Sequence, residues 1–210
     1  MTIKTVLAGA ALAVLGFAAS SAQAVTLYNN AAPTGELATD VPAVVDTFDA
    51  GSGGAALASF IVDGYASLDG QNYYEDDFTL SLNGTAIVTG TFNLGGGGYN
   101  VVYSAPSGAS AINLSGLNDP NVVTFTGGQE MLVVPLTLAA GSNSLSFSYH
   151  SLTDGHAGFQ GVGDEGWGVQ QVLVSSAVPE PAAWAFMVMG FAGLGAALRT
   201  ARRNRLAAIV

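Results

Sequence analysis

The stretch Phe78-Thr79-Leu80-Ser81-Leu82-Asn83-Gly84, followed by residues 85–92, decides the fold class of this chain. Its apolar residues alternate with Thr79 and Ser81, which is the period of a strand with one buried face. The pair Asn83-Gly84 readily adopts the two positive φ angles that a type I′ turn requires. The stretch therefore predicts a β-hairpin in which residues 78–82 pair with residues 85–92.

Further strand signals follow along residues 25–178. Residues 144–150 alternate strictly, so Leu145, Phe147 and Tyr149 are predicted to face a core. Pro135 cannot donate a ladder hydrogen bond, so its strand is expected at a sheet edge or with a bulge. Val172 and Val174 are expected to face the core from the closing strand. The other predicted strands are residues 25–28, 44–48, 60–62, 99–103, 111–114, 122–125, 131–138 and 167–174.

The fold class follows from the number and spacing of these strands. No stretch between residues 25 and 178 has the 3.6-residue period of a helix, and the glycine run 95–98 is expected to be a loop. About nine to eleven short strands separated by Gly and Asn predict an all-β fold, a single β-sandwich of jelly-roll type at residues 25–177. No sequence repeat indicates a solenoid.

Residues 1–24 have the pattern of a secretory signal peptide. Lys4 precedes an apolar run over residues 6–19, and Ala22-Gln23-Ala24 is a small-residue cleavage pattern. We expect cleavage after Ala24, which gives a mature chain that begins at Val25. A second membrane anchor is the alternative.

The residues after 178 have the composition of a membrane segment. Residues 182–198 carry no charge and would span about 25 Å as a helix, slightly less than a hydrocarbon core of about 30 Å. Trp184 lies where an interfacial ring is favoured, and the basic residues behind the segment predict a cytoplasmic C-terminus. These residues are Arg199, Arg202, Arg203 and Arg205. Composition alone predicts an ordinary C-terminal transmembrane anchor.

A short motif, Pro179-Glu180-Pro181, directly precedes this predicted helix. Together with Trp184, the small-residue segment around Gly190 and the arginine cluster, it resembles the PEP-CTERM sorting signal of Gram-negative bacteria over residues 178–205. Residues 206–210 form an additional tail. The resemblance implies recognition by an exosortase-type membrane protease, transient insertion in the inner membrane and removal of the helix. The cargo would then be released, or attached at the cell surface, usually in a bacterium that makes exopolysaccharide.

The predicted mature domain is acidic. Residues 25–178 contain fourteen Asp or Glu, two His and no Lys or Arg, whereas the whole chain has a formal net charge of −10. This charge argues against a nucleic-acid partner, because nucleic acid is bound largely through Lys and Arg at its phosphates. It also disfavours anionic membranes and acidic polysaccharides unless divalent cations bridge them. Solubility outside the cell is the simpler interpretation. The chain has no cysteine, so disulfides and thiolate metal sites are excluded.

The loop of residues 153–167 is the best candidate ligand site in the sequence. A sugar site needs an aromatic platform and a few polar groups, and either Trp167 or Phe159 would supply the platform. The alternative is that Trp167 packs in the core. Residues 134–147 and 166–174 also resemble the last strands of carbohydrate-binding jelly rolls, which implies an exopolysaccharide ligand. The candidate ligand-binding residues are Asp154, His156, Phe159, Asp164, Glu165 and Trp167.

Calcium is the metal that the acidic residues favour, because hard cations take several oxygen ligands. Two sequence clusters offer carboxylates: one is Asp154, Asp164 and Glu165, and the other is Asp69, Glu75, Asp76 and Asp77. Neither has the spacing of an Asp-x-Asp-x-Asp-Gly loop, so the metal ligands remain unassigned and a structural calcium stays an option. His150 and His156 lack a zinc-site motif.

The sequence assigns no catalytic residues. It predicts an exported, non-enzymatic surface or extracellular-matrix protein that is structural or glycan-binding in an exopolysaccharide or biofilm setting. Two alternatives stay open. One is a secreted glycan-acting hydrolase that uses two carboxylates among Asp154, Asp164 and Glu165, and the other is a calcium-stabilised adhesin. The expected partners are the exosortase-type protease and exopolysaccharide.

Overall fold

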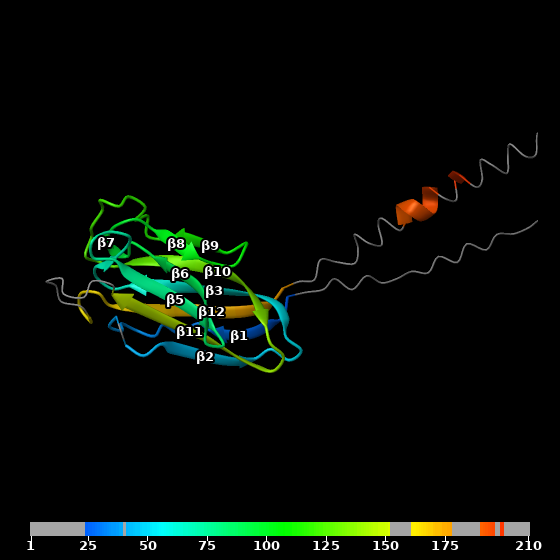
Figure 1. Cartoon of the computed structure of the whole chain (residues 1–210), viewed down its shortest axis with the longest axis horizontal. Coiled ribbons are helices and arrows are strands. Elements are labelled where there is room, and N and C mark those ends of the chain that lie inside the picture. The colour runs from blue at the N-terminus through cyan, green and yellow to red at the C-terminus, as the bar shows by residue number, and fades with distance from the viewer. Residues whose placement is uncertain (1–23, 40, 152–160, 178–189, 196–197, 200–210) are drawn as a thin grey trace, which may run out of the picture. The chain divides into compact units, whose positions relative to one another are not determined.

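The computed structural model describes residues 24–39, 41–151, 161–177, 190–195 and 198–199. The chain divides into two compact units, and Ala24–Ala177 is the unit that contains the β domain (Figure 1). In the other unit, Met1–Gln23 with Val178–Val210, the described residues 190–195 and 198–199 are helical.

Within the described residues, no helix is both long and apolar enough to span a membrane. The membrane helix expected at residues 182–198 lies largely outside the described residues. So do Ala22, the Pro179-Glu180-Pro181 motif, Trp184 and three of the four arginines, Arg202, Arg203 and Arg205. Ala24 and Arg199 are described, and both are exposed.

The described part of the β domain contains twelve strands. They are β1 (Thr26–Asn30), β2 (Val44–Asp49), β3 (Gly54–Gly64), β4 (Leu68–Asp69), β5 (Asp76–Leu82), β6 (Thr85–Thr91), β7 (Gly95–Gly97), β8 (Val101–Ser104), β9 (Ser110–Asn113), β10 (Gly128–Leu138), β11 (Ser142–Ser151) and β12 (Trp167–Ser176). Two antiparallel sheets have the orders β1-β12-β3-β10-β9 and β2-β11-β5-β6-β8, and β4 pairs with β7 in parallel. The two large sheets pack as layers of a sandwich, which confirms the predicted all-β class (Figure 1).

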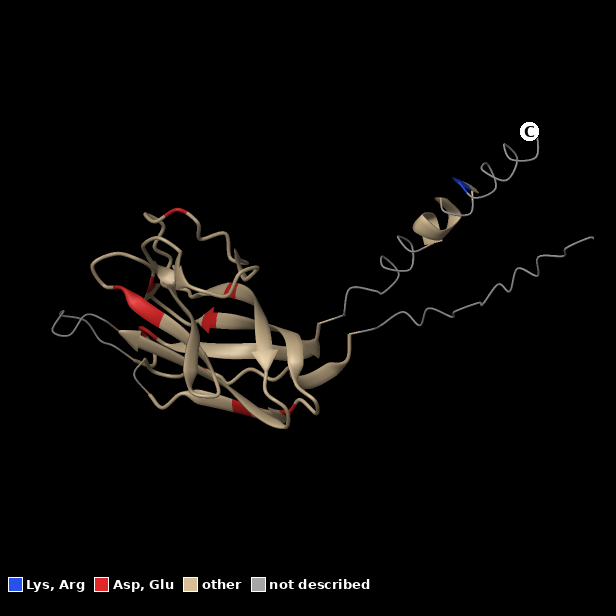
Figure 2. Cartoon of the chain, turned by 45° about the vertical axis from the view of Figure 1, so that its right-hand side comes forward, with Lys and Arg blue, Asp and Glu red and all other residues tan. Residues whose placement is uncertain are grey.

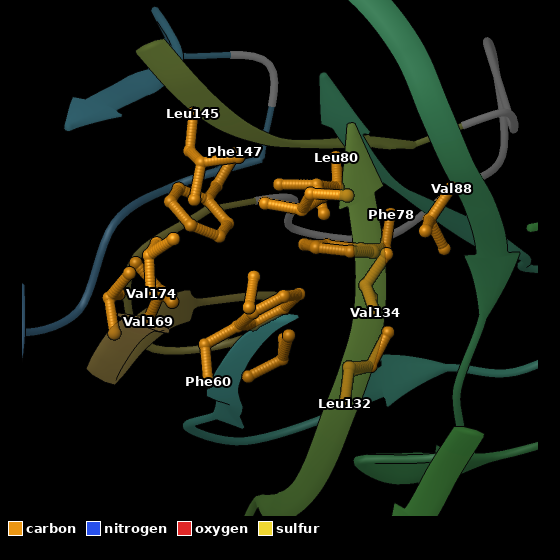
Figure 3. Close-up of a cluster of buried hydrophobic side chains, with 14 of the residues drawn as sticks. Phe60, Phe78, Leu80, Val88, Leu132, Val134, Leu145, Phe147, Val169 and Val174 are labelled. Atoms are coloured by element: carbon orange, nitrogen blue, oxygen red, sulfur yellow. The ribbon is translucent and has the colours of Figure 1, made fainter. Parts of the chain in front are cut away.

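The core lies between the two large sheets (Figure 3). Phe60 of β3 meets Phe147 of β11 edge to face, with ring centroids 5.0 Å apart, and lies 5.9 Å from the ring of Phe78 on β5. Leu145, Phe147 and Tyr149 are buried, as their alternation predicts. Burying each large apolar side chain contributes roughly 1.5–3 kcal/mol, so these facing rings hold the two layers together.

The predicted hairpin is confirmed. β5 and β6 pair in antiparallel fashion, and the register ends at Leu82↔Thr85 around the two-residue turn. Asn83 and Gly84 have φ angles of 51° and 79°, as a type I′ turn requires.

The sequence predicts a loop for the glycine run 95–98, and the structure corrects this. Gly95–Gly97 forms strand β7, which pairs with β4. A Cβ on Gly95 would lie 2.0 Å from the carbonyl oxygen of Ala66, so only bare backbone fits here. The strand expected at residues 122–125 is absent from the structure, where these residues form an irregular segment. The backbone amides of Thr124 and Phe125 both donate to the Gly95 carbonyl, so they anchor this segment to β7.

Pro135 lies on a strand with neighbours on both sides, which corrects the expected sheet edge. β10 pairs with β3 over its whole length, but its register with β9 ends at Val133↔Ser110. Pro135 therefore lies beyond the last paired residue on the β9 side, where the ladder needs no amide donor.

Strand β12 contains a β-bulge at Gln171, where the alternation of buried and exposed side chains shifts by one residue. Its register against β3 shifts between Gln170 and Leu173, and Gln171 has a φ angle of 53°. This bulge adds one residue to the alternation, so Val169 and Val172 both face the core. Val172 and Val174 are buried, as the sequence predicts.

Candidate functional site

The structure describes half of the loop residues that the sequence offers as a ligand site. Asp154, His156 and Phe159 lie outside the described residues. Asp164 is half-buried and Glu165 is buried, and both precede β12. Trp167 is the first residue of that strand.

Trp167 is a core residue. Its exposed fraction is 0 %, its ring centroid lies 5.8 Å from that of Tyr149, and its indole Nε1 donates a 2.9 Å hydrogen bond to the carbonyl of Ala38. A ring enclosed in this way cannot stack on a sugar in solvent. Of the two roles considered for Trp167, the structure therefore supports core packing and not the platform.

Three carboxylates from distant segments come together beside this part of the core. One ligand oxygen from each of Asp69, Asp76 and Glu165 lies within 4.8 Å of the others. Their exposed fractions are 6 %, 0 % and 7 %, so all three are buried. The cluster combines members of both acidic clusters in the sequence. Asp77 follows Asp76 on β5 and points to the opposite face, because side chains alternate along a strand.

Hydrogen bonds fix Asp69 and Asp76 relative to one another. The backbone amide of Asp69 donates to Asp76 Oδ2 at 3.0 Å, and Asn72 Nδ2 lies 2.5 Å from Asp69 Oδ1. The hydroxyl of Thr91 lies 3.1 Å from the carbonyl oxygen of Asp69 and 2.8 Å from that of Asp76. Neighbouring strands thus hold both carboxylates in place.

Glu165 is placed by its neighbours in the chain. Ser67 donates its amide to the Asp164 carbonyl at 2.8 Å and its hydroxyl to Asp164 Oδ1 at 2.7 Å. Tyr65 donates its amide to the Gly166 carbonyl at 2.9 Å. These bonds attach the backbone on both sides of Glu165 to the segment that leads into Asp69.

The close approach of three buried carboxylates favours binding of a cation. Burial raises the pKa of Asp69 to about 6, and the nearby charge of Asp164 also raises it. The hydrogen bond from Asn72 acts in the opposite direction and lowers this pKa. Residues 25–178 contain no Lys or Arg, and Arg199 is the sole Lys or Arg among the described residues (Figure 2). Burial disfavours the charged form of a carboxylate, and a shared cation lowers that cost when several carboxylates lie together. Oxygens within 4.8 Å of each other fit around one Ca²⁺, whose ligands lie about 2.3–2.6 Å from the ion.

No protein-family model matches this chain, and no curated protein matches it in sequence. The chemistry of the cluster therefore has to be inferred from its own residues. Three buried carboxylates and nearby backbone carbonyls are a donor set for a hard cation such as calcium.

Sequence reasoning named all three carboxylates but did not join them, because no local spacing connects Glu165 with Asp69 and Asp76. It missed Glu130, which is buried on the core face of β10 in line with Leu132 and Val134. Burial raises the pKa of Glu130 to about 7. The sequence did contain a signal for it, because Glu130 occupies the same alternating positions as the apolar residues Leu132 and Val134.

Proposed function

We propose that this chain is an exported, exosortase-processed protein of the cell surface or extracellular matrix, with a non-enzymatic domain that is structural or glycan-binding. The observation that carries this function is the tail of residues 178–205, with its Pro-Glu-Pro motif, apolar segment and arginine cluster. The chain would cross the inner membrane, stay anchored briefly and then reach an exopolysaccharide matrix or biofilm. The all-β domain and its lack of Lys and Arg suit that environment.

The domain would have the winding of a jelly roll. β2 pairs with β11 in one sheet, and the next strand, β3, pairs with the preceding strand, β10, in the other sheet. Nested pairs that alternate between two sheets are the pattern produced by rolling up one long hairpin. This supports the likeness to carbohydrate-binding jelly rolls, although fold alone does not establish binding.

A structural calcium bound by Asp69, Asp76 and Glu165 is part of this proposal. The three oxygens lie within 4.8 Å of each other, all three carboxylates are buried, and the ion would neutralise their negative charge. Such an ion would join the start of β5 to the segment before β12. The same observation favours a calcium-stabilised adhesin as the second candidate function.

A glycan-acting hydrolase has less support. The Asp164 carboxylate accepts the Ser67 hydroxyl, and Glu165 is buried against Asp69 and Asp76. A catalytic pair must reach both sides of a glycosidic bond in an open cleft. Neither described acid of the candidate loop has that access.

Mass spectrometry of the mature protein tests the sorting function. The full chain would be expressed in a Gram-negative host that encodes an exosortase-type protease, and in the same host without that protease. We expect the intact host to release a protein that lacks Trp184 through Arg205, and the deletion strain to retain these residues. Replacing Pro179-Glu180-Pro181 by three alanines should block processing, while Pro33→Ala should not. Retention of Trp184 through Arg205 in the intact host would refute exosortase processing.

A further inference from the structure

Building on the proposed glycan-binding role, we propose that the domain binds a neutral sugar ring on the outer face of the β1-β12-β3-β10-β9 sheet. The site is a hollow of about 490 Å³ whose lining includes Asp63, Tyr65, Gln129 and Gln170. Its lining includes neither the carboxylate cluster nor any of the described loop residues 161–167. Its volume lies in the range of roughly 300–1,000 Å³ that small-ligand sites occupy.

Asp63 organises the polar side of this sugar site. It is buried on β3, directly opposite Gln129 of β10. Gln129 Nε2 donates to Asp63 Oδ1 at 2.7 Å, and Gln170 Nε2 lies 2.8 Å from each carboxylate oxygen. The carboxylate therefore fixes the orientation of two amide groups on neighbouring strands. Each amide also has a carbonyl oxygen, so the hollow offers oriented groups to sugar hydroxyls.

Tyr65 supplies the apolar side. It follows Asp63 by two residues, and 38 % of its surface is exposed. Its ring lies close to the bare backbone of Gly168, where an added Cβ would be 3.1 Å from Tyr65 Cε2. A tyrosine ring beside oriented amides is the combination that a sugar needs, because one face of a sugar ring carries C–H groups and its rim carries hydroxyls.

Glycine backbone forms part of the wall of the hollow. Gly64, Gly127 and Gly128 contribute to its lining without side chains. Gly127 has a φ angle of 75°, and a Cβ there would lie 2.0 Å from the carbonyl oxygen of Gly64. No other residue fits at Gly127 without moving the backbone, so the hollow is part of the folded framework.

The charges around the site select a neutral ligand. Burial raises the pKa of Tyr65, and the charges of Asp63 and Glu36 raise it further, so both carboxylates act on its hydroxyl. Residues 25–178 contain no Lys or Arg that would attract a uronate, sulfate or phosphate group. A divalent cation is also disfavoured here, because Asp63 is the one carboxylate among the described lining residues and already accepts three amide contacts.

Isothermal titration calorimetry of the full chain in a zwitterionic, sugar-free detergent tests this site. The probes are cellotriose, maltotriose, mannotriose and galactotriose as neutral sugars, and trigalacturonate as the anionic one. We expect at least one neutral trisaccharide to bind, and trigalacturonate to bind at least tenfold more weakly. Tyr65→Ala should weaken binding at least tenfold, Tyr65→Phe by less than about threefold, and Gln170→Leu at least fivefold.

Two variants separate this site from the rest of the protein. Thr126→Trp places a large ring in the exposed rim of the hollow and should abolish binding, whereas Tyr99→Ala removes an exposed tyrosine outside it and should change nothing. An unchanged melting temperature would show that Thr126→Trp and Tyr65→Ala still fold. Binding that survives both variants would overturn this site but leave glycan binding by the domain intact. Absence of binding to all four neutral sugars would also overturn it, without bearing on the processing of the tail.

Discussion

Ser67 and Asp164 are joined twice across the domain, by an amide-to-carbonyl hydrogen bond of 2.8 Å and a hydroxyl-to-carboxylate hydrogen bond of 2.7 Å. They are 97 positions apart in the sequence. This connection fixes the backbone beside Glu165 and so determines that its carboxylate meets Asp69 and Asp76. The acidic cluster is therefore a product of tertiary structure, and it can be tested apart from the tail.

Calcium should stabilise the β domain at neutral pH. At a calcium concentration about 100-fold above Kd, mass action contributes about 2.7 kcal/mol. For a domain of this size that corresponds to roughly 5–10 °C in Tm. Differential scanning calorimetry of the full chain at pH 7.5, with calcium or with EDTA, measures this shift. Asp76→Asn should remove most of it, because Asp76 is fully buried in the cluster.

The control for calcium is an acid outside the cluster. Asp119 is exposed, and Asp119→Asn should leave the calcium-dependent shift unchanged. Magnesium should give a smaller shift than calcium, since it requires near-octahedral geometry and gives up its waters reluctantly. Equal melting temperatures in calcium and EDTA would exclude a structural calcium.

In EDTA, the stability of the domain should fall as the pH rises from about 4 to about 7. Burial raises the pKa of Asp69 and of Asp77 to about 6, and that of Glu130 to about 7. In this window the folded state therefore binds more protons than the unfolded chain, whose carboxyl pKa values are about 4. The free energy of unfolding must then decrease with rising pH. Urea denaturation at several pH values measures the slope.

Glu130→Gln isolates one contribution to this pH dependence. Gln cannot ionise, so the variant should lose the part of the slope between about pH 5 and pH 7 and be more stable than the parent at pH 7.5. For the unsubstituted protein, adding calcium should raise the free energy of unfolding at pH 7.5. It should have little effect at pH 4.5, where Asp69 is protonated. Stability that increases between pH 5 and pH 7 in EDTA would contradict the raised pKa values.

Local patterns predicted much of the fold. The β5–β6 hairpin was predictable because its alternation and its Asn83-Gly84 turn lie in one short stretch. Residues 122–125 are mostly apolar, but both of the amides that they donate to β7 go to the single carbonyl of Gly95 and form no ladder, so composition alone predicted a strand wrongly. β7 was missed because a strand of three glycines has no side-chain pattern and is defined only by its parallel partner, β4.

The candidate sites were less predictable than the fold. Asp63, Gln129 and Gln170 lie on three strands, and only the register places them side by side on one face of the sheet. The same holds for Asp69 and Glu165, which no motif spacing links. For Trp167 the sequence left a binding platform and a core position open, and the β12 register places the residue in the core.

Asn143, the second residue of β11, should be among the most sensitive positions beside the turn between β10 and β11. Its buried amide donates to the carbonyls of Ala139 and Gly141 at 2.9 and 3.0 Å, and accepts from the Ala139 amide at 3.0 Å and from Asn83 Nδ2 at 2.9 Å. Asn143→Ala leaves several of these groups unsatisfied and should cost about 2–4 kcal/mol. Chemical denaturation measures the loss. Asn121→Ala, in an exposed turn, is the control and should change the free energy of unfolding by less than about 0.5 kcal/mol. A loss below about 1 kcal/mol at Asn143 would show that water replaces its bonds.

The bulge at Gln171 should favour glycine. Gln171 is exposed and has a φ angle of 53°, a conformation that is unfavourable by roughly 1–2 kcal/mol for residues with a Cβ. Glycine removes this strain but adds freedom to the unfolded chain, so Gln171→Gly should raise the free energy of unfolding by about 0.5–1 kcal/mol. Gln171→Val should lower it by about 1–2 kcal/mol, because a β-branched side chain is least tolerated at positive φ. Thr137→Gly, at an exposed position of regular strand β10, should lower it by about 1 kcal/mol. If Gln171→Gly lowered stability as much as Thr137→Gly does, positive φ would not be what determines the residue at the bulge.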